Sequence, residues 1–157
     1  MTNPNEPEPQ SITYEHFRQT SAAAHAALLA MGKAVDDSGL EKELTELVKL
    51  RVSQINGCAF CTQLHLNVAR RIGVETQKLD LLVAWRDAGV YSARERAALL
   101  WAEQVSNMAT HRTKSDDYTA LFRDFSEEEA INLTVAIANI NAWNRIAGGL
   151  HFPPPAA

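Results

Sequence analysis

Apolar residues recur every three to four positions along most of the chain. The spacing is clear at Leu79, Leu82 and Val83, and again at Ala97 and Leu100. A period near 3.6 residues places such side chains on one face of an α-helix. No segment alternates strictly between apolar and polar residues, and no proline occurs between positions 10 and 152. The pattern therefore predicts an all-α fold, a single-domain helical bundle with helices over residues 12–35, 41–56, 58–72, 75–87, 92–109, 115–124 and 126–147.

Local signals support several of these helix ends. Ser92 and Ser126 are each followed three residues later by a glutamate, Glu95 and Glu129. In such a capping box each side chain accepts a hydrogen bond from a free backbone amide at the helix start. Gly73 follows a periodic segment, where helices commonly end in left-handed backbone. The last helix carries apolar residues on more than one face, so we expect it to be central or covered by another subunit.

The two ends of the chain differ from the rest in composition. Residues 1–11 are rich in Asn, Pro and Glu, and residues 151–157 read HFPPPAA. Proline has no amide hydrogen to donate, so the second segment cannot continue a helix. We expect disordered tails at 1–11 and 151–157 around one helical domain at 12–150.

Composition limits the classes of partner. The formal net charge is −4, and the basic residues are scattered singly or in short pairs. Nucleic-acid binding requires a basic stripe, which this pattern lacks. No apolar run reaches the roughly 18 residues of a membrane span, and the polar start MTNPNEPEPQ is unlike a signal peptide. We expect a cytoplasmic protein that binds neither nucleic acid nor membranes.

Candidate chemistry is concentrated in the stretch INGCAFCTQLH at residues 55–65, which holds both cysteines of the chain. Cys58, Cys61 and His65 are spaced by three and four residues, which places them on one face of a helix. In a reducing compartment a cysteine pair is rarely a structural disulfide and more often performs redox chemistry or binds metal. The spacing therefore predicts a joint site.

Position on the helix predicts different roles for the two thiols. Cys58 lies at the helix start, where free amides and the macrodipole favour a thiolate. His65 lies one turn beyond Cys61 and is placed to take its proton directly or through a water. We expect Cys61 to be the deprotonated nucleophile and Cys58 to close the disulfide.

A carboxylate on the preceding helix is expected to join the site. If Asn56 and Gly57 form the turn of a helix pair, Glu46 lies about 3 Å along the axis from His65. The same register leaves Glu46 about 9 Å from Cys61, too far to contact the thiol. This register predicts a proton relay from Glu46 through His65 to Cys61.

The stretch ELVKLRVSQINGCAFCTQLH, from Glu46 to His65, resembles the core signature of the AhpD-like alkylhydroperoxidases in the carboxymuconolactone decarboxylase family. The later stretch AIANINAWNRIA also resembles this family. The matching elements of the signature are Glu46, the run Leu50-Arg51-x-Ser53-Gln54-x-Asn56, Cys58-x-x-Cys61 and His65.

The resemblance implies an all-α protein that assembles into trimers or hexamers. It implies a thiol-dependent peroxidase or disulfide oxidoreductase that needs no metal or organic cofactor. A small-molecule peroxide or disulfide would oxidise one cysteine and the other would resolve it, and a lipoyl-type or thioredoxin-like dithiol would restore the pair. The family's catalytic positions are matched here by Glu46, Cys58, Cys61 and His65. Decarboxylases of the wider family lack the cysteine pair, which disfavours that activity.

One position departs from this pattern. AhpD itself has a histidine immediately before the second cysteine, where this chain has Phe60. We expect the phenyl ring to pack over the site and to reduce access of water. Desolvation raises the pKa of a thiol, so Cys61 is expected to ionise less readily than in a C-x-H-C site.

Other interpretations remain open. The two thiols with His65 and Glu46 offer four ligands for zinc, although structural zinc sites usually draw further Cys or His ligands from a second loop. A redox-sensing or binding module could also use the same dithiol with little turnover.

Several conspicuous side chains are expected to be structural. Arg51 and Gln54 are expected to pair with neighbours more readily than to enter the site. The tryptophans at positions 85, 101 and 143 are expected to pack in the core. The histidines that lack a partner at useful spacing are expected to be exposed or to cap helices: His16, His25, His111 and His151.

Overall fold

The computed structural model describes residues 11–157, and the tail predicted at the N-terminus lies almost entirely outside these residues. Within 11–157 the chain is helical and contains no strand, which confirms the predicted all-α class. None of these helices is long and apolar enough to cross a membrane. The elements are α1 (Tyr14–Thr20), α2 (Ala22–Asp37), α3 (Lys42–Ile55), α4 (Ala59–Ile72), α5 (Thr76–Asp80), the 3-10 turn η1 (Leu82–Ala84), α6 (Ala93–Ser106), α7 (Ser115–Leu121) and α8 (Glu127–Gly149).

The helix-capping residues in the sequence predicted several helix ends correctly. The capping boxes of α6 and α8 are both formed, at Ser92 with Glu95 and at Ser126 with Glu129. Gly73 has φ 91° and ends α4, because glycine enters the left-handed region without steric cost.

Two of the predicted helices are divided. Residues 12–35 form α1 and α2, because Ser21 leaves helical geometry with φ −121° and ψ 50°. Residues 75–87 form the short α5 and η1 in place of one helix. Leu79 and Leu82 are nevertheless both buried, so the apolar spacing persists across the break. Periodicity alone therefore could not reveal the division.

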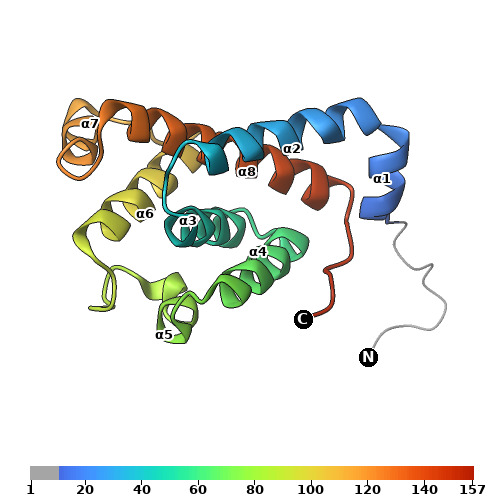
Figure 1. Cartoon of the computed structure of the whole chain (residues 1–157), viewed down its shortest axis with the longest axis horizontal. Coiled ribbons are helices and arrows are strands. Elements are labelled where there is room, and N and C mark those ends of the chain that lie inside the picture. The colour runs from blue at the N-terminus through green and yellow to red at the C-terminus, as the bar shows by residue number, and fades with distance from the viewer. Residues whose placement is uncertain (1–10) are drawn as a thin grey trace.

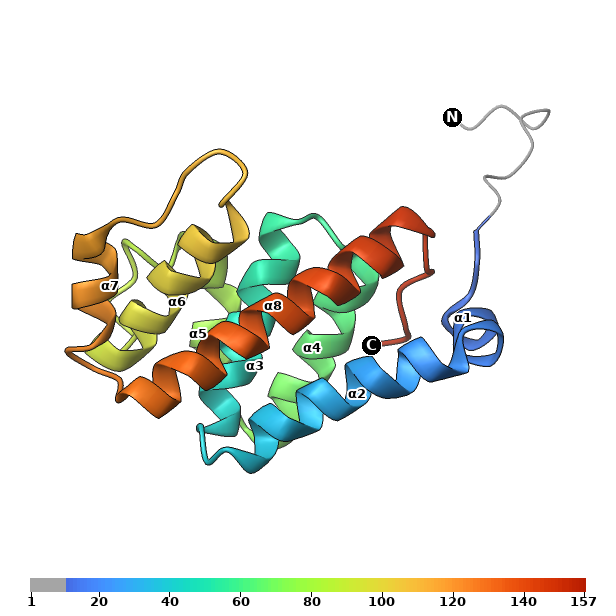
Figure 2. The same ribbon diagram turned by 90° about the horizontal axis from the view of Figure 1, so that it is seen from above.

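Helices α2 and α8 lie on one side of the α3–α4 pair (Figure 1). The view from above shows α8 running between α2 and α6, with α7 at the far end (Figure 2). Helix α8 packs against α2, α3, α4 and α6, so its predicted central position is confirmed. Many of its apolar side chains are buried within one chain, although Ile131 is 57% exposed. A homo-oligomer, trimer or hexamer, stays a prediction.

Helix α3 is buried on two sides and so holds the site rigidly. Val48 and Val52 belong to the larger core shared with α8, whereas Leu47 and Leu50 belong to a second core that includes Leu82. All five side chains are almost fully buried. Packing on both sides fixes the rotation of α3 about its own axis.

The C-terminal segment is not the disordered tail that its prolines suggested. It leaves α8 as non-helical chain, but Phe152 is only 4% exposed. The ring of Phe152 lies 5.4 Å from that of Phe60 and 5.8 Å from that of Phe17, centroid to centroid. Asn67 Nδ2 also donates a hydrogen bond to the Ala156 carbonyl at 2.7 Å. The prolines end the helix, and an apolar anchor then docks the segment.

Phe152→Ala is expected to lower the free energy of unfolding by about 3 kcal/mol, because it removes a buried ring from an aromatic cluster. Urea denaturation monitored by circular dichroism measures this loss. Val83 is 69% exposed, so Val83→Ala serves as the control and should change stability by less than about 0.5 kcal/mol. An unchanged midpoint for Phe152→Ala would mean that the segment is not docked in solution.

Candidate active site

The turn between α3 and α4 builds the site. Gly57 adopts φ 64°, and the Cys58 amide donates to the Ser53 carbonyl at 3.0 Å. The chain thus reverses within two residues, and Cys58 becomes the N-cap of α4. The predicted helix pair around Asn56 and Gly57 is therefore confirmed.

Both cysteines are free thiols, each 2% exposed. Cys58 Sγ accepts a hydrogen bond from the Cys61 backbone amide at 3.2 Å, in the position of an N-cap side chain. A hydrogen bond from the Cys61 thiol, with those from the backbone amides of Cys61 and Phe60 and from the Asn144 side chain, lowers the pKa of Cys58 to about 7 against the effect of burial. These donors all stabilise negative charge on one sulfur.

The hydrogen-bond donors around the two sulfurs favour negative charge on Cys58, whereas the prediction placed it on Cys61. Cys61 was expected to be the deprotonated thiol, but its hydrogen bond to Cys58 and its burial raise its pKa well above the ordinary value. The physical reason lies in the helix start, because the free amides converge on Cys58 whereas Cys61 is the residue that donates. The sequence signal for this order is the position of Cys58 at the N-terminus of a helix.

Glu46 and His65 form the contact that the helix-pair register predicted. His65 Nδ1 lies 2.7 Å from Glu46 Oε2, and the carboxylate is almost completely buried. Burial by itself would raise the pKa of Glu46, but the hydrogen bond and charge of His65, together with Lys49, lower it to about 2. An ionised carboxylate can only accept, so Nδ1 carries the hydrogen of this bond.

Two lysines complete the surroundings of Glu46, and sequence reasoning did not include either of them. Lys49 Nζ lies 2.9 Å from Glu46 Oε1, and Lys42 Nζ lies 3.3 Å from the same oxygen. Lys42 also pairs with Asp36 of α2 at 2.7 Å. The spacings of three and four residues from Glu46 on one helix were the available signal. The lysines help to hold Glu46 as a carboxylate.

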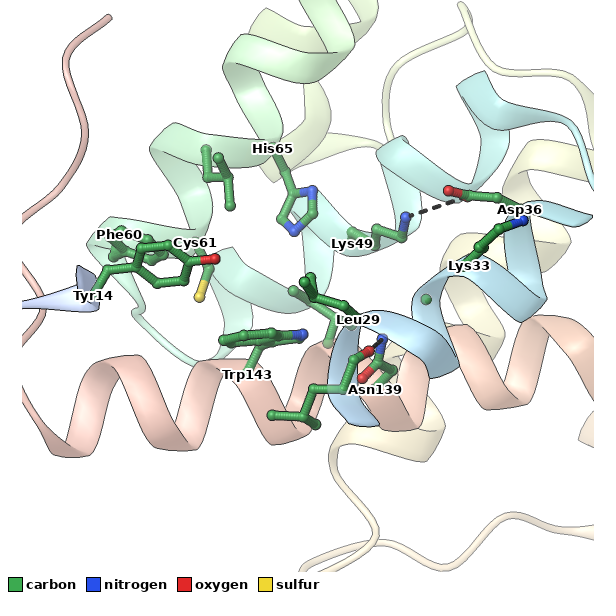
Figure 3. Close-up of a pocket in the computed structure, with 14 residues that line it drawn as sticks. Tyr14, Leu29, Lys33, Asp36, Lys49, Phe60, Cys61, His65, Asn139 and Trp143 are labelled. Carbon is green, nitrogen blue, oxygen red and sulfur yellow. Dashed lines mark hydrogen bonds and ion pairs between the residues drawn. The ribbon is translucent and has the colours of Figure 1, made fainter. Parts of the chain in front are cut away.

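A cavity of about 280 Å³ lies against the site, between α2, α4 and α8. Cys61 and His65 both line it, and Figure 3 shows them on its wall with Trp143 opposite. Cys58 is not among the residues that line this cavity. A molecule in the cavity can therefore reach the Cys61 sulfur, while the Cys58 sulfur lies behind it.

Phe60 packs as predicted. Its ring is buried, lines the cavity and stacks on Tyr14 with centroids 5.6 Å apart and 24° between planes. Together with Trp143 these rings give the cavity an aromatic end beside Cys61.

The predicted proton relay does not reach Cys61 through a direct hydrogen bond from His65. Within residues 11–157, His65 is hydrogen-bonded to Glu46 and to neither cysteine. The thiol of Cys61 and the imidazole share the cavity, so a bound substrate can contact both.

Most of the remaining predictions for single residues are confirmed. Arg51 pairs with Glu103 at 2.7 Å and also donates to Gln54, away from the cavity. The indoles of Trp85 and Trp101 are buried. The side chains of His16, His111 and His151 are exposed.

One prediction of this kind was wrong. His25 is buried, and its Nε2 lies 2.7 Å from the Tyr14 hydroxyl, a partner eleven residues away on another helix. Trp143 packs against the core as predicted, but it is only partly buried and also forms a wall of the cavity. Neither arrangement has a short-range signal in the sequence.

Asn144 was also missed. It reaches from α8 to donate to Ser53 Oγ at 3.1 Å and accepts from Asn56 Nδ2 at 2.9 Å, directly behind the thiols. Its side chain lowers the pKa of both cysteines. Several asparagines in an otherwise apolar helix were the available signal.

The zinc alternative has no geometric support in the part of the chain that the structure describes. Across residues 11–157, no three or more His, Cys, Asp or Glu side chains are grouped so that they could hold a metal ion.

Comparison with known proteins gives consistent matches. The model of the carboxymuconolactone decarboxylase family matches residues 22–104. The uncharacterized protein YdfG of Bacillus subtilis (strain 168) is 36% identical over 120 residues, which cover 76% of this chain and 82% of YdfG. Both the family model and this relative include the segment that holds the two cysteines.

Solved structures share the fold. An Agrobacterium tumefaciens protein of unknown function, provisionally described as the antioxidant defence protein AhpD, superimposes with a TM-score of 0.88 at 39% identity, covering 95% of this chain and 100% of that one. The debrominase Bmp8 superimposes with a TM-score of 0.79 at 24% identity, covering 88% of this chain and 74% of that one. At this identity the second likeness shows the fold alone.

Proposed function

Because this chain belongs to the carboxymuconolactone decarboxylase family and is AhpD-like, we propose that it is a thiol-dependent oxidoreductase that reduces hydroperoxides or disulfides. One observation carries the proposal. Two free thiols lie one helical turn apart, with the Cys61 backbone amide donating to Cys58 Sγ, and Cys61 lines a cavity whose wall also presents a histidine held by a buried carboxylate. This arrangement provides a nucleophile, a resolving thiol and a proton carrier.

Access and ionisation point to different sulfurs, and both have a role in the proposed first step. A hydroperoxide in the cavity reaches Cys61, whereas the surrounding hydrogen-bond donors favour negative charge on Cys58. The Cys58 thiolate acts as general base, so the Cys61 proton passes to it as the Cys61 sulfur attacks the terminal peroxide oxygen. The S–O bond forms as the O–O bond breaks. Cys61 becomes a sulfenic acid and an alkoxide leaves.

His65 supplies the proton that the alkoxide needs. The Glu46 carboxylate holds the ring of His65 through Nδ1, and in its protonated form His65 gives a proton to the alkoxide, which becomes the alcohol, and then takes a proton from solvent. Glu46 thus acts on the substrate through His65.

Disulfide formation completes the oxidative half of the cycle. Cys58 sulfur attacks the sulfenic sulfur of Cys61, the S–S bond forms, and hydroxide leaves with the Cys58 proton as water. Two thiols have then been oxidised to one disulfide, and the hydroperoxide has been reduced to alcohol and water. A lipoyl-type or thioredoxin-like dithiol returns the pair to thiols by exchange, a role supported by the likeness to AhpD.

The proposal is tested by adding one equivalent of cumene hydroperoxide to the reduced protein. Both thiols should be lost together, and peptide mass spectrometry should find a bond between Cys58 and Cys61. Thiols that survive, or that proceed separately to sulfinic acids, would contradict the proposed cycle.

A further inference from the structure

A tyrosine and a histidine that the proposed cycle does not use form a pair at the aromatic end of the cavity. Tyr14 of α1 lines the cavity together with Cys61 and His65. Its hydroxyl lies 2.7 Å from Nε2 of His25, which is buried in α2. Figure 3 shows the hydroxyl end of Tyr14 turned toward the part of the cavity where Cys61 and His65 lie. The cavity wall around Cys61 therefore presents a phenolic hydroxyl as well as an imidazole.

Aromatic packing holds both rings of this pair. The Tyr14 ring stacks on that of Phe60, with centroids 5.6 Å apart. The His25 ring is in edge contact with the rings of Phe17 and Trp143, at centroid distances of 6.2 and 5.9 Å. Rings packed on several sides have few rotamers open to them. The hydroxyl is therefore held in place before a substrate enters, and no ordering is required when the substrate binds.

The Tyr14 hydroxyl can form more hydrogen bonds than the one to His25. A phenol offers one hydrogen and also accepts, and a neutral imidazole can donate through Nε2. Among residues 11–157, Nε2 is the ring nitrogen of His25 that has a hydrogen bond, so a buried ring hydrogen is best placed there. His25 then donates to the Tyr14 oxygen, and the hydroxyl hydrogen is free to point into the cavity. Successive hydrogen bonds polarise one another, which makes Tyr14 a stronger donor.

We propose that Tyr14 is a further catalytic residue, whose hydroxyl donates a hydrogen bond to the oxygen that leaves when Cys61 attacks a hydroperoxide, and that His25 positions this hydroxyl. As the S–O bond forms and the O–O bond breaks, the electron pair of the O–O bond stays on the leaving oxygen. Tyr14 stabilises that charge and keeps its own hydrogen, while His65 supplies the proton that makes the alcohol. The inference rests on the proposed function, because it assigns a role in the first step of that cycle.

Two oxidants of similar size separate this role from a structural one. Cumene hydroperoxide releases an alkoxide, whereas perbenzoic acid releases benzoate, a far weaker base that needs little help from a donor. Tyr14→Phe keeps the ring that stacks on Phe60 and removes only the hydroxyl. In stopped-flow measurements on the reduced full-length protein, this variant should oxidise Cys61 about tenfold more slowly than the wild type with cumene hydroperoxide. With perbenzoic acid the rate should change by less than about twofold.

Tyr91→Phe is the matched control. Tyr91 is buried, and its hydroxyl donates to the Lys78 carbonyl at 2.6 Å, away from the cavity. This variant also loses the hydrogen bond of a tyrosine hydroxyl, and it should leave the rates with both oxidants unchanged. A Tyr14→Phe variant that slows both oxidants equally, or neither, would contradict the catalytic role.

Variants of His25 test the positioning role. His25→Gln places an amide N–H near the position of Nε2 and should retain most of the rate with cumene hydroperoxide. His25→Leu removes the donor and should lose most of what Tyr14→Phe loses, again with cumene hydroperoxide alone. The double variant should be little slower than Tyr14→Phe, because His25 acts through the hydroxyl. Losses that multiply would overturn this positioning role. Should Tyr14→Phe fail to fold, the contrast between His25→Gln and His25→Leu still decides.

Failure of this inference and failure of the proposed function give different results. A wild type that forms the disulfide between Cys58 and Cys61, with Tyr14→Phe as fast as the wild type with both oxidants, would remove Tyr14 from the mechanism and leave the cycle standing. A wild type whose thiols survive both oxidants would refute the cycle, and the role of Tyr14 with it.

Discussion

Replacing Cys61 with serine should lower the rate of reaction with cumene hydroperoxide by about 10³-fold or more, because the sulfur that faces the cavity is lost. Cys58→Ser should also stop turnover, but only after the first step. It should leave a sulfenic acid on Cys61 that dimedone traps, since no second thiol is present to form the disulfide. Stopped-flow kinetics and mass spectrometry of the dimedone adduct measure the two results.

The pH dependence separates the two cysteines further. The Cys58 thiolate takes the Cys61 proton, so the wild-type rate should rise with pH through the Cys58 pKa of about 7. Below that pH the acceptor is protonated and the reaction slows. In Cys58→Ser no thiolate is available to take the Cys61 proton. The rate at which Cys61 reacts should therefore stay low at neutral pH and rise only at more alkaline pH. A Cys61→Ser variant that forms a Cys58 sulfenic acid at the wild-type rate would assign the attack to Cys58.

The second large effect concerns Glu46 and His65. Glu46→Gln and His65→Gln should each lower peroxide turnover by about 10²-fold or more, because the proton carrier is uncharged or absent. The double variant should be little worse than His65→Gln alone, since Glu46 contacts the substrate only through His65. Steady-state kinetics with a dithiol reductant measure this coupling.

Stability must be separated from rate in this series. Glu46→Gln weakens the partner of the buried Lys49 and is expected to reduce stability as well. Glu103→Gln is the matched control, because Glu103 is a partly buried glutamate with cationic partners that lies away from the cavity. It should lower stability and leave the peroxide rate nearly unchanged. Losses at Glu46 and His65 that simply multiply would mean that Glu46 acts elsewhere.

Features that depend on neighbouring residues were predictable from the sequence. Capping boxes such as Ser92 with Glu95 depend on one helical turn, and the placement of Glu46 beside His65 depends on one tight turn and a fixed rise per residue. In both cases a few positions determine the geometry. Residue spacing predicted which side chains form the site, and the resemblance to the family predicted the class of reaction.

Features that depend on distant partners were not predictable. Phe152 docks on Phe60, and His25 bonds to Tyr14, because tertiary packing brings their helices and the C-terminal segment together. The ionisation order of the thiols depends on which donors point at which sulfur, and one of those donors is Asn144 of α8.

Counting hydroperoxide molecules reduced per chain tests the redox cycle most directly. With a small dithiol such as dihydrolipoamide in excess, the reduced wild-type protein should consume many equivalents of cumene hydroperoxide at a constant rate, and Cys58→Ser should stop after about one. Consumption that ends after about one equivalent in the wild type with each of several dithiols would contradict the enzyme and identify the cysteine pair as a redox sensor.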